Sequence, residues 1–195
     1  MYVTLIVLFL TNYLIGSLSA DMFFEEVQKI GFVQKLHQSL LGLYPFITKA
    51  EVFSNIVFEF ASGCLIALIA LHFLSTPLYI LGACFAGIIG QVFPLFKSKY
   101  DNCFPIFAGT LAILFGWFFA LLLIAMWIFI RRESNMTFFT HLAVTALVPF
   151  LTLITGQPLL SFGYTILVTA LIFLTRIGQI RDMIAGKNNE LILNA

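Results

Sequence analysis

The longest apolar stretch of this chain runs without a charged residue from Phe104 to Ile130, a length of 27 residues. One membrane-spanning helix needs about 20 residues, so the stretch is long for one crossing and short for two. A chain that crosses twice would turn near Gly116, in the middle of the stretch. The rest of the sequence decides between these two arrangements.

Composition places the whole chain in the membrane class. Of 195 residues, 61% are apolar and 10% are charged, and the mean hydropathy is +1.05. Such values are typical of an integral membrane protein and not of a soluble domain. With a net charge of +1 and no basic stripe, the chain is not expected to bind nucleic acid. The three cysteines form no CxxC pair, and we expect them to be small buried residues.

Apolar segments and the breaks between them predict an all-α protein with a single membrane domain over residues 1–195. The first segment lacks a basic N-terminal region and a cleavage site, so we expect a retained helix and not a signal peptide. Between the first two segments, residues 20–37 show helical spacing of apolar side chains, typical of an amphipathic helix at the membrane interface. The spans expected are 2–18, 52–73, 77–96, 104–116, 117–130, 138–154 and 158–175.

The placement of the ten basic residues favours the hairpin at Gly116. If the 27-residue stretch crosses the membrane once, five basic residues fall on each side. If it crosses twice, all ten share one side, as the positive-inside rule prefers. The sequence therefore predicts seven transmembrane helices, with the N-terminus outside and the C-terminus in the cytoplasm.

Polar residues within the spans gather toward the cytoplasmic half and predict an inward-facing pocket, near the polar turn at 97–105. Glu59 is an intramembrane carboxylate, which is by default a functional hypothesis, and Ser62 lies on the same helix face. The structural alternative is that Glu59 is protonated, or hydrogen-bonded to a neighbour that holds helices in register. Gly82, Ala86 and Gly90 form a row of small residues that predicts close helix packing.

Four fragments resemble the bacterial acyl-phosphate:glycerol-3-phosphate acyltransferases of the PlsY type. They are Tyr13–Ser17, Phe58–Gly63 (FEFASG, similar to Asp-Phe-x-Lys-Gly), Gly90–Pro94 (GQVFP, similar to Gly-His-x-x-Pro) and the tail from Arg176 to Lys187. The resemblance implies seven helices, an active site facing the cytoplasm and a place in the inner (plasma) membrane. It covers nearly the whole chain in order and spacing.

The same resemblance implies a changed site. Ser62 stands at the family's lysine, Gln91 at its histidine and Gln179 at its asparagine, and the glycine-rich phosphate loops have no counterpart. Acyl transfer between two phosphate-bearing substrates needs cations and backbone amides around them. The catalytic candidates are Glu59, Ser62, Gln91 and Gln179, and the candidates for binding phosphate or lipid are Lys35, Lys97, Lys99, Arg176 and Arg181.

Three functional hypotheses follow. The favoured one is a non-catalytic PlsY-like protein of phospholipid metabolism that binds membrane lipid or a protein partner subunit. The alternative is an active acyltransferase that moves an acyl group from acyl phosphate to glycerol 3-phosphate and yields lysophosphatidic acid. A third, a small transporter coupled through Glu59, lacks the repeat symmetry usual in transporters. No ligand spacing for a metal occurs, and no cofactor is expected.

Overall fold

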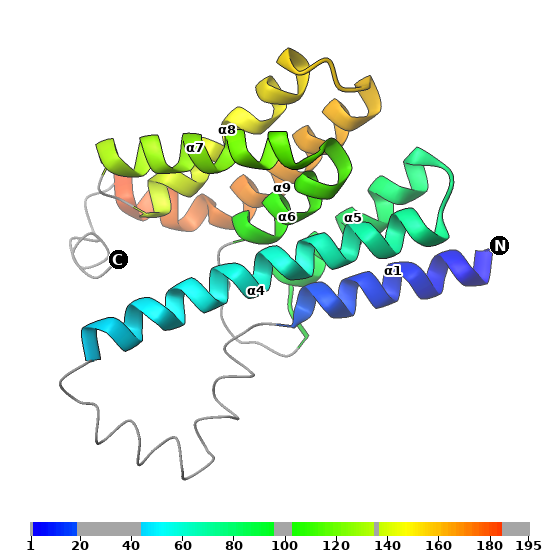
Figure 1. Cartoon of the computed structure of the whole chain (residues 1–195), viewed down its shortest axis with the longest axis horizontal. Coiled ribbons are helices and arrows are strands. Elements are labelled where there is room, and N and C mark those ends of the chain that lie inside the picture. Colours follow the sequence, from blue (N-terminus) through cyan, green and yellow to red (C-terminus); the bar gives the residue numbers. More distant parts are fainter. Residues whose placement is uncertain (1, 19–43, 96–102, 135–136, 185–195) are drawn as a thin grey trace, which may run out of the picture.

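The computed structural model describes residues 2–18, 44–95, 103–134 and 137–184. All regular structure in these ranges is helical (Figure 1). The segment 20–37 lies outside them, as do Lys35, Lys97 and Lys99. The helices are α1 (Tyr2–Ser17), α4 (Tyr44–Phe73), α5 (Pro77–Val92), α6 (Phe104–Phe115), α7 (Trp117–Ser134), α8 (Thr137–Ile154) and α9 (Leu159–Ile184).

The 27-residue apolar stretch forms two helices that part at Gly116. The backbone of Gly116 has a φ of 93°, which a residue without Cβ adopts at no steric cost. Its carbonyl accepts a hydrogen bond from the Phe119 N–H at 3.0 Å and so starts α7. The predicted all-α fold with seven helices is confirmed for the described part of the chain.

Some helices are longer or shorter than the spans predicted from the apolar stretches. Helix α4 begins at Tyr44, before the span expected from residue 52, and α9 continues to Ile184, beyond the expected end at residue 175. Both helices extend past their apolar spans because backbone hydrogen bonding does not stop where apolar residues stop. Helix α5 instead ends early, at Val92, since Pro94 disfavours helical geometry at Phe93, whose φ is −123°.

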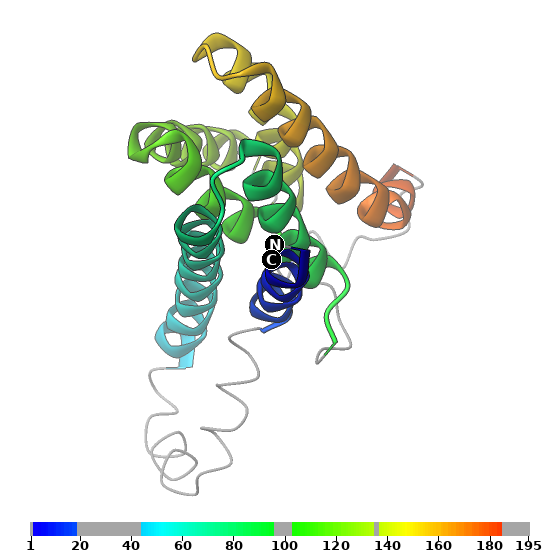
Figure 2. The same ribbon diagram turned by 90° about the vertical axis from the view of Figure 1, so that its right-hand side faces the viewer.

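Several helices pack against helices that are not their neighbours in the chain. Helices α1 and α4 run alongside each other in both views (Figures 1 and 2), and α5 packs against both. Helix α6 lies against α4 and α7, while α8 joins α7 to α9, which also reaches α5. The contact between α5 and α9 thereby links the first helices of the bundle to the last.

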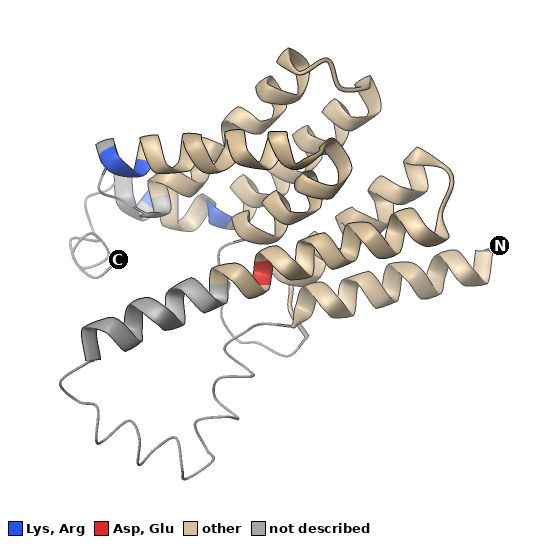
Figure 3. Ribbon diagram, in the orientation of Figure 1, with Lys and Arg blue, Asp and Glu red and all other residues tan. Residues whose placement is uncertain are grey.

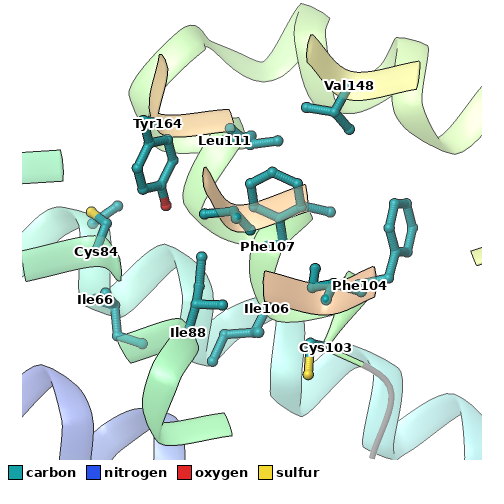
Figure 4. Packing of buried hydrophobic residues seen from close by; sticks show 14 of the residues in the cluster. Ile66, Cys84, Ile88, Cys103, Phe104, Ile106, Phe107, Leu111, Val148 and Tyr164 are labelled. Atoms are coloured by element: carbon teal, nitrogen blue, oxygen red, sulfur yellow. The ribbon is translucent and has the colours of Figure 1, made fainter. Parts of the chain in front are cut away.

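Helix α6 is short and is surrounded by protein. Every residue from Phe104 to Ala112 is buried, and twelve residues rise only about 18 Å, against a hydrocarbon core of about 30 Å. Short helices are tolerated at membrane depth where other protein covers them. Figure 4 shows Ile106, Phe107 and Leu111 of α6 among side chains of α4, α5, α8 and α9, at the centre of the core.

The outer surface of the bundle is apolar. Large side chains such as Leu121, Phe129 and Ile154 are 63%, 68% and 83% exposed. Two helices contain windows long and apolar enough to cross a membrane, Ile56–Phe73 and Leu159–Arg181, and four shorter apolar helices accompany them. An apolar exterior of this extent suits lipid and not water.

Candidate functional site

Glu59 of α4 and Gln91 of α5 meet in the interior. The Gln91 Nε2 donates a hydrogen bond to Glu59 Oε1 at 3.1 Å. The two side chains are only 6% and 5% exposed. A buried carboxyl group needs such donors, because burial without them leaves a strong acceptor unsatisfied. The structure thus brings together two catalytic candidates that are 32 positions apart in sequence.

Ser62 lies one turn beyond Glu59 but its hydroxyl serves its own helix. The Ser62 Oγ donates to the Phe58 carbonyl at 2.9 Å, and the side chain is 9% exposed. Serine hydroxyls in helices commonly bond back in this way. The next residue, Gly63, packs against α6 so closely that a Cβ there would lie 2.1 Å from the Ile106 carbonyl oxygen.

The ends of α1 and α5 are joined beside this pair. Ser17 Oγ donates to the carbonyls of Tyr13 at 2.8 Å and Gly90 at 3.3 Å. The Tyr13 hydroxyl donates to the Phe93 carbonyl at 2.7 Å. Gly90 permits this approach, because a Cβ there would lie 2.1 Å from the Tyr13 oxygen. Fragments 13–17 and 90–94, both part of the family resemblance, are therefore neighbours in space.

Cys103 is a buried residue whose thiol is affected by charges on α4 and α9. It precedes α6 and is 5% exposed. Burial raises the pKa of its thiol to about 12, the Arg176 charge opposes that rise and the Glu59 charge adds to it.

The remaining described candidates, all on α9, are less buried than the Glu59–Gln91 pair. Arg176 Nη1 donates to Gln179 Oε1 at 2.8 Å, one turn along α9. Gln179 and Arg181 are exposed, whereas Arg176 is half-buried. Figure 3 shows the described Lys and Arg residues on α7 and α9 and the described Asp and Glu on α4.

Asn12 is a buried polar residue that the sequence analysis missed. It is fully buried, and its Nδ2 donates to the Ala83 carbonyl at 3.1 Å and the Ile66 carbonyl at 3.5 Å. One amide on α1 therefore contacts both α4 and α5. The signal in the sequence was an amide inside an apolar span, which usually faces other helices.

The buried Glu59–Gln91 pair can form hydrogen bonds, but it offers a phosphate group no positive charge. A carboxyl group hydrogen-bonded to an amide is neutral when protonated and anionic otherwise, and neither form attracts a phosphate. Arg176 supplies positive charge at the edge. In the part of the chain that the structure describes, no group of three or more His, Cys, Asp or Glu side chains is placed to hold a metal ion.

Comparison with solved structures finds two close matches to this fold. No protein-family model matches the chain, and neither does the sequence of any curated protein. Crystal structures of PlsY (YgiH), an integral membrane glycerol 3-phosphate acyltransferase, superpose with TM-scores of 0.74 for the lysophosphatidic acid form and 0.73 for the glycerol 3-phosphate form. Sequence identity is 18% and 20%, and each match covers 94% of this chain and 93% of the other. The resemblance drawn from the four sequence fragments is supported, and the chain has the fold of PlsY.

Proposed function

We propose that this protein is a PlsY-like integral membrane protein of phospholipid metabolism that binds an anionic lipid and does not transfer acyl groups. The observation behind the proposal is the buried Glu59–Gln91 hydrogen bond at 3.1 Å. Gln91 stands where the family resemblance implies a histidine, and Ser62, one turn from Glu59, stands where it implies a lysine.

Electrostatics argue against acyl transfer here. The reaction would bring an acyl phosphate and glycerol 3-phosphate together, so negative charge would accumulate on at least two phosphate groups. Catalysis of that kind depends on preorganised donors and cations at the developing charge. Ser62 and Gln91 stand where the family resemblance implies a lysine and a histidine, so neutral side chains replace the cation and the imidazole expected there.

Lipid binding is supported by what the fold retains. The PlsY structures include forms with glycerol 3-phosphate and lysophosphatidic acid, and the present chain keeps a similar arrangement of helices with an apolar exterior. Arg176, half-buried near the end of α9, adds positive charge at the edge of the bundle. A phosphate-bearing lipid would place its chains along the apolar helices and its head group near this arginine.

A second candidate function is an active acyltransferase, favoured by one feature of the same pair. The Glu59 carboxylate is a group that could accept the proton of an attacking hydroxyl, with Arg176 holding a phosphate. In this alternative the acceptor would be glycerol 3-phosphate, the donor acyl phosphate and the product lysophosphatidic acid.

An assay of phosphate release separates these two functions. The purified protein is mixed with acyl phosphate and glycerol 3-phosphate, and inorganic phosphate and lysophosphatidic acid are measured. We expect no turnover above that of Glu59→Gln, which keeps the shape of the site and removes the carboxylate. Turnover that Glu59→Gln abolishes would establish the acyltransferase and refute the non-catalytic proposal.

A protein partner subunit is the other occupant that we considered. Purification in mild detergent tests it, because a stable subunit should be recovered with a stoichiometric partner. We expect the protein to be recovered with bound lipid alone, and a stoichiometric protein would contradict the lipid-binding proposal.

We also propose that the protein lies in the inner (plasma) membrane with its N-terminus outside and its C-terminus in the cytoplasm. This orientation puts the connection between α6 and α7 on the outer side. Trp117, at that connection, is 61% exposed, so Trp117→Cys in intact cells should react with a membrane-impermeant maleimide. Reaction only after the cells are opened would reverse the orientation.

A further inference from the structure

We propose that Pro149 is a hinge in α8 and that the Thr169 hydroxyl of α9 is the latch that holds α8 in the conformation of this structure. The part that moves is the end of the α8–α9 hairpin, residues 150–163, which we call the tip segment. This inference is independent of the proposed function, because it rests on the hairpin alone and holds whether or not the protein binds lipid.

Pro149 removes one backbone hydrogen bond from the interior of α8. Proline has no N–H to donate to the carbonyl four residues earlier, which here is that of Thr145, and its ring pushes that carbonyl aside. Sharp bends in helices are usually found at such positions. Helix α8 is therefore weakest at the turn between Thr145 and Pro149.

Thr169 supplies a donor from the neighbouring helix. Its Oγ1 donates to the Thr145 carbonyl at 3.2 Å, and this is the carbonyl that Pro149 leaves without its helical partner. Proline is tolerated in transmembrane helices where threonine or serine side chains satisfy the freed carbonyl in this way. The contact therefore ties the weak turn of α8 to α9.

The latch can open at low cost. Other threonine hydroxyls of these two helices donate within their own helix, as Thr145 does to His141, Thr165 to Phe162 and Thr175 to Ile172. The Thr169 hydroxyl can turn back toward a carbonyl of α9 in the same way. Hydrogen bonds between membrane helices contribute little to stability on average. The latched and unlatched conformations are therefore close in free energy.

The turn within the tip segment is well fixed. Gly156 has a φ of 68°, and its N–H donates to the Leu153 carbonyl at 3.1 Å, while the Gln157 N–H donates to the Thr152 carbonyl at 3.1 Å. This pair of hydrogen bonds is the Schellman motif, which closes the end of a helix. Because the turn keeps its shape, bending at Pro149 moves the tip segment as one unit.

Little packing holds the tip segment in place. No residue from Leu153 to Leu160 is buried, and the connection between α8 and α9 projects beyond the other helices in both views (Figures 1 and 2). Thr152 Oγ1 lies 3.4 Å from Thr165 Oγ1, which is long for a hydrogen bond between hydroxyls. A Cβ on Gly163 would meet nothing within 4 Å, whereas the next residue, Tyr164, is 5% exposed. The core therefore holds α9 only from Tyr164 onward.

Distances between spin labels measure this motion directly. The labelled positions are Ile154, on the tip segment and 83% exposed, and Phe73, at the end of α4 and 60% exposed. Both are changed to cysteine in the full chain, whose three native cysteines are replaced by alanine. We expect pulsed electron resonance to show two distances for Ile154→Cys with Phe73→Cys. The control pair, Val3→Cys with Phe73→Cys, lies on α1 and α4 and should show one.

Variants of Thr169 test the latch. Thr169→Val keeps the shape of the side chain and removes the hydroxyl, so it should raise the ratio of the second distance to the first roughly threefold. Thr169→Ser keeps the hydroxyl and should behave as the parent protein does. Thr175→Val removes a hydroxyl that bonds only within α9, and it should also match the parent.

Pro149→Ala tests the hinge. Alanine restores the backbone N–H, so the Thr145 carbonyl regains a donor from its own helix. We expect a single distance for this variant, and the addition of Thr169→Val should then change nothing. Such dependence of one substitution on the other would show that the hinge and the latch act together.

Each contrary result overturns a named part of the proposal. A single distance in both the parent and Thr169→Val would overturn the hinge, and two distances that persist in Pro149→Ala would overturn its position. An equal effect of Thr175→Val would overturn the role of Thr169. Circular dichroism guards against misfolding, because a loss of helix in Thr169→Val would mean that the hydroxyl supports the whole fold and is not a local latch.

Discussion

Helices α1, α4, α5 and α6 approach one another through glycine, whereas α7, α8 and α9 meet through larger side chains. A Cβ added to Gly16, Gly63, Gly90 or Gly109 would lie 1.8–2.1 Å from a backbone oxygen of the facing helix. A Cβ added to Gly163 or Gly178 on α9 would meet nothing within 4 Å. Small residues therefore determine packing in the first group and not in the second.

The difference separates a rigid centre from a more accessible edge. Close backbone contacts join α5 to α1 and α4 to α6, so both helices that carry the Glu59–Gln91 hydrogen bond are held by a neighbour. Helices α8 and α9 are linked instead by threonine, since Thr169 Oγ1 donates to the Thr145 carbonyl at 3.2 Å. Arg131 and Arg176 lie on this second group, near the ends of α7 and α9.

The largest effect is expected from Gly63→Ala. The added methyl group would lie 2.1 Å from the Ile106 carbonyl oxygen and 3.0 Å from the Thr110 nitrogen, neither of which is the end of a flexible side chain. We expect the free energy of unfolding in detergent to fall by at least about 2–3 kcal/mol, measured by circular dichroism during denaturant titration.

Gly163→Ala is the matched control in the second group. With nothing near its Cβ, alanine should leave stability unchanged or raise it by up to about 1 kcal/mol, since alanine favours helix. Equal losses at the two positions would show that the helix groups do not differ in packing.

Next comes Gln91→Leu, which removes the Nε2 donor to Glu59 and leaves a buried carboxyl group with one partner fewer. The expected loss of stability is about 1–3 kcal/mol. The double variant Glu59→Leu with Gln91→Leu should recover part of it, because removing both polar partners is better tolerated than removing one. A double-variant loss equal to the sum of the single losses would mean that the two side chains do not interact.

A smaller loss is expected for Asn12→Leu, of about 1 kcal/mol, in keeping with interhelical hydrogen bonds in membrane proteins. The substitution breaks the contacts of α1 with the Ala83 and Ile66 carbonyls. Thr11→Val is its control, since that hydroxyl bonds only the Val7 carbonyl of its own helix. A larger loss for Thr11→Val would contradict the bridging role of Asn12.

The smallest effect should be that of Thr169→Val, about 0.5 kcal/mol. It removes the α9-to-α8 hydrogen bond and keeps the side-chain shape. Thr175→Val, whose hydroxyl bonds Ile172 within α9, should change unfolding less. If Thr169→Val cost more than Gly63→Ala, threonine contacts would dominate packing and the comparison of the two groups would be reversed.

The helix positions could be predicted from the sequence because they depend on local properties. The apolar stretches and Gly116 gave seven helices, although α5, expected to reach residue 96, ends at Val92. The ends of α4 and α9 could not be predicted in this way, since a helix continues beyond the apolar residues that reveal it. The residues that form a site were harder to predict from the sequence, because hydrogen bonds such as that between Glu59 and Gln91 join positions far apart in the chain.

The sequence by itself determined the class of protein, the number of helices and the family that its fold resembles, since hydrophobic length and short motifs are local features. Only the tertiary structure decided the use of each polar group. It paired Glu59 with Gln91, turned the Ser62 hydroxyl back to Phe58 and buried an unsatisfied nitrogen of Arg131 near His141. Partners of buried polar groups are set by helix packing, because each must find a donor or acceptor on whichever helix lies beside it.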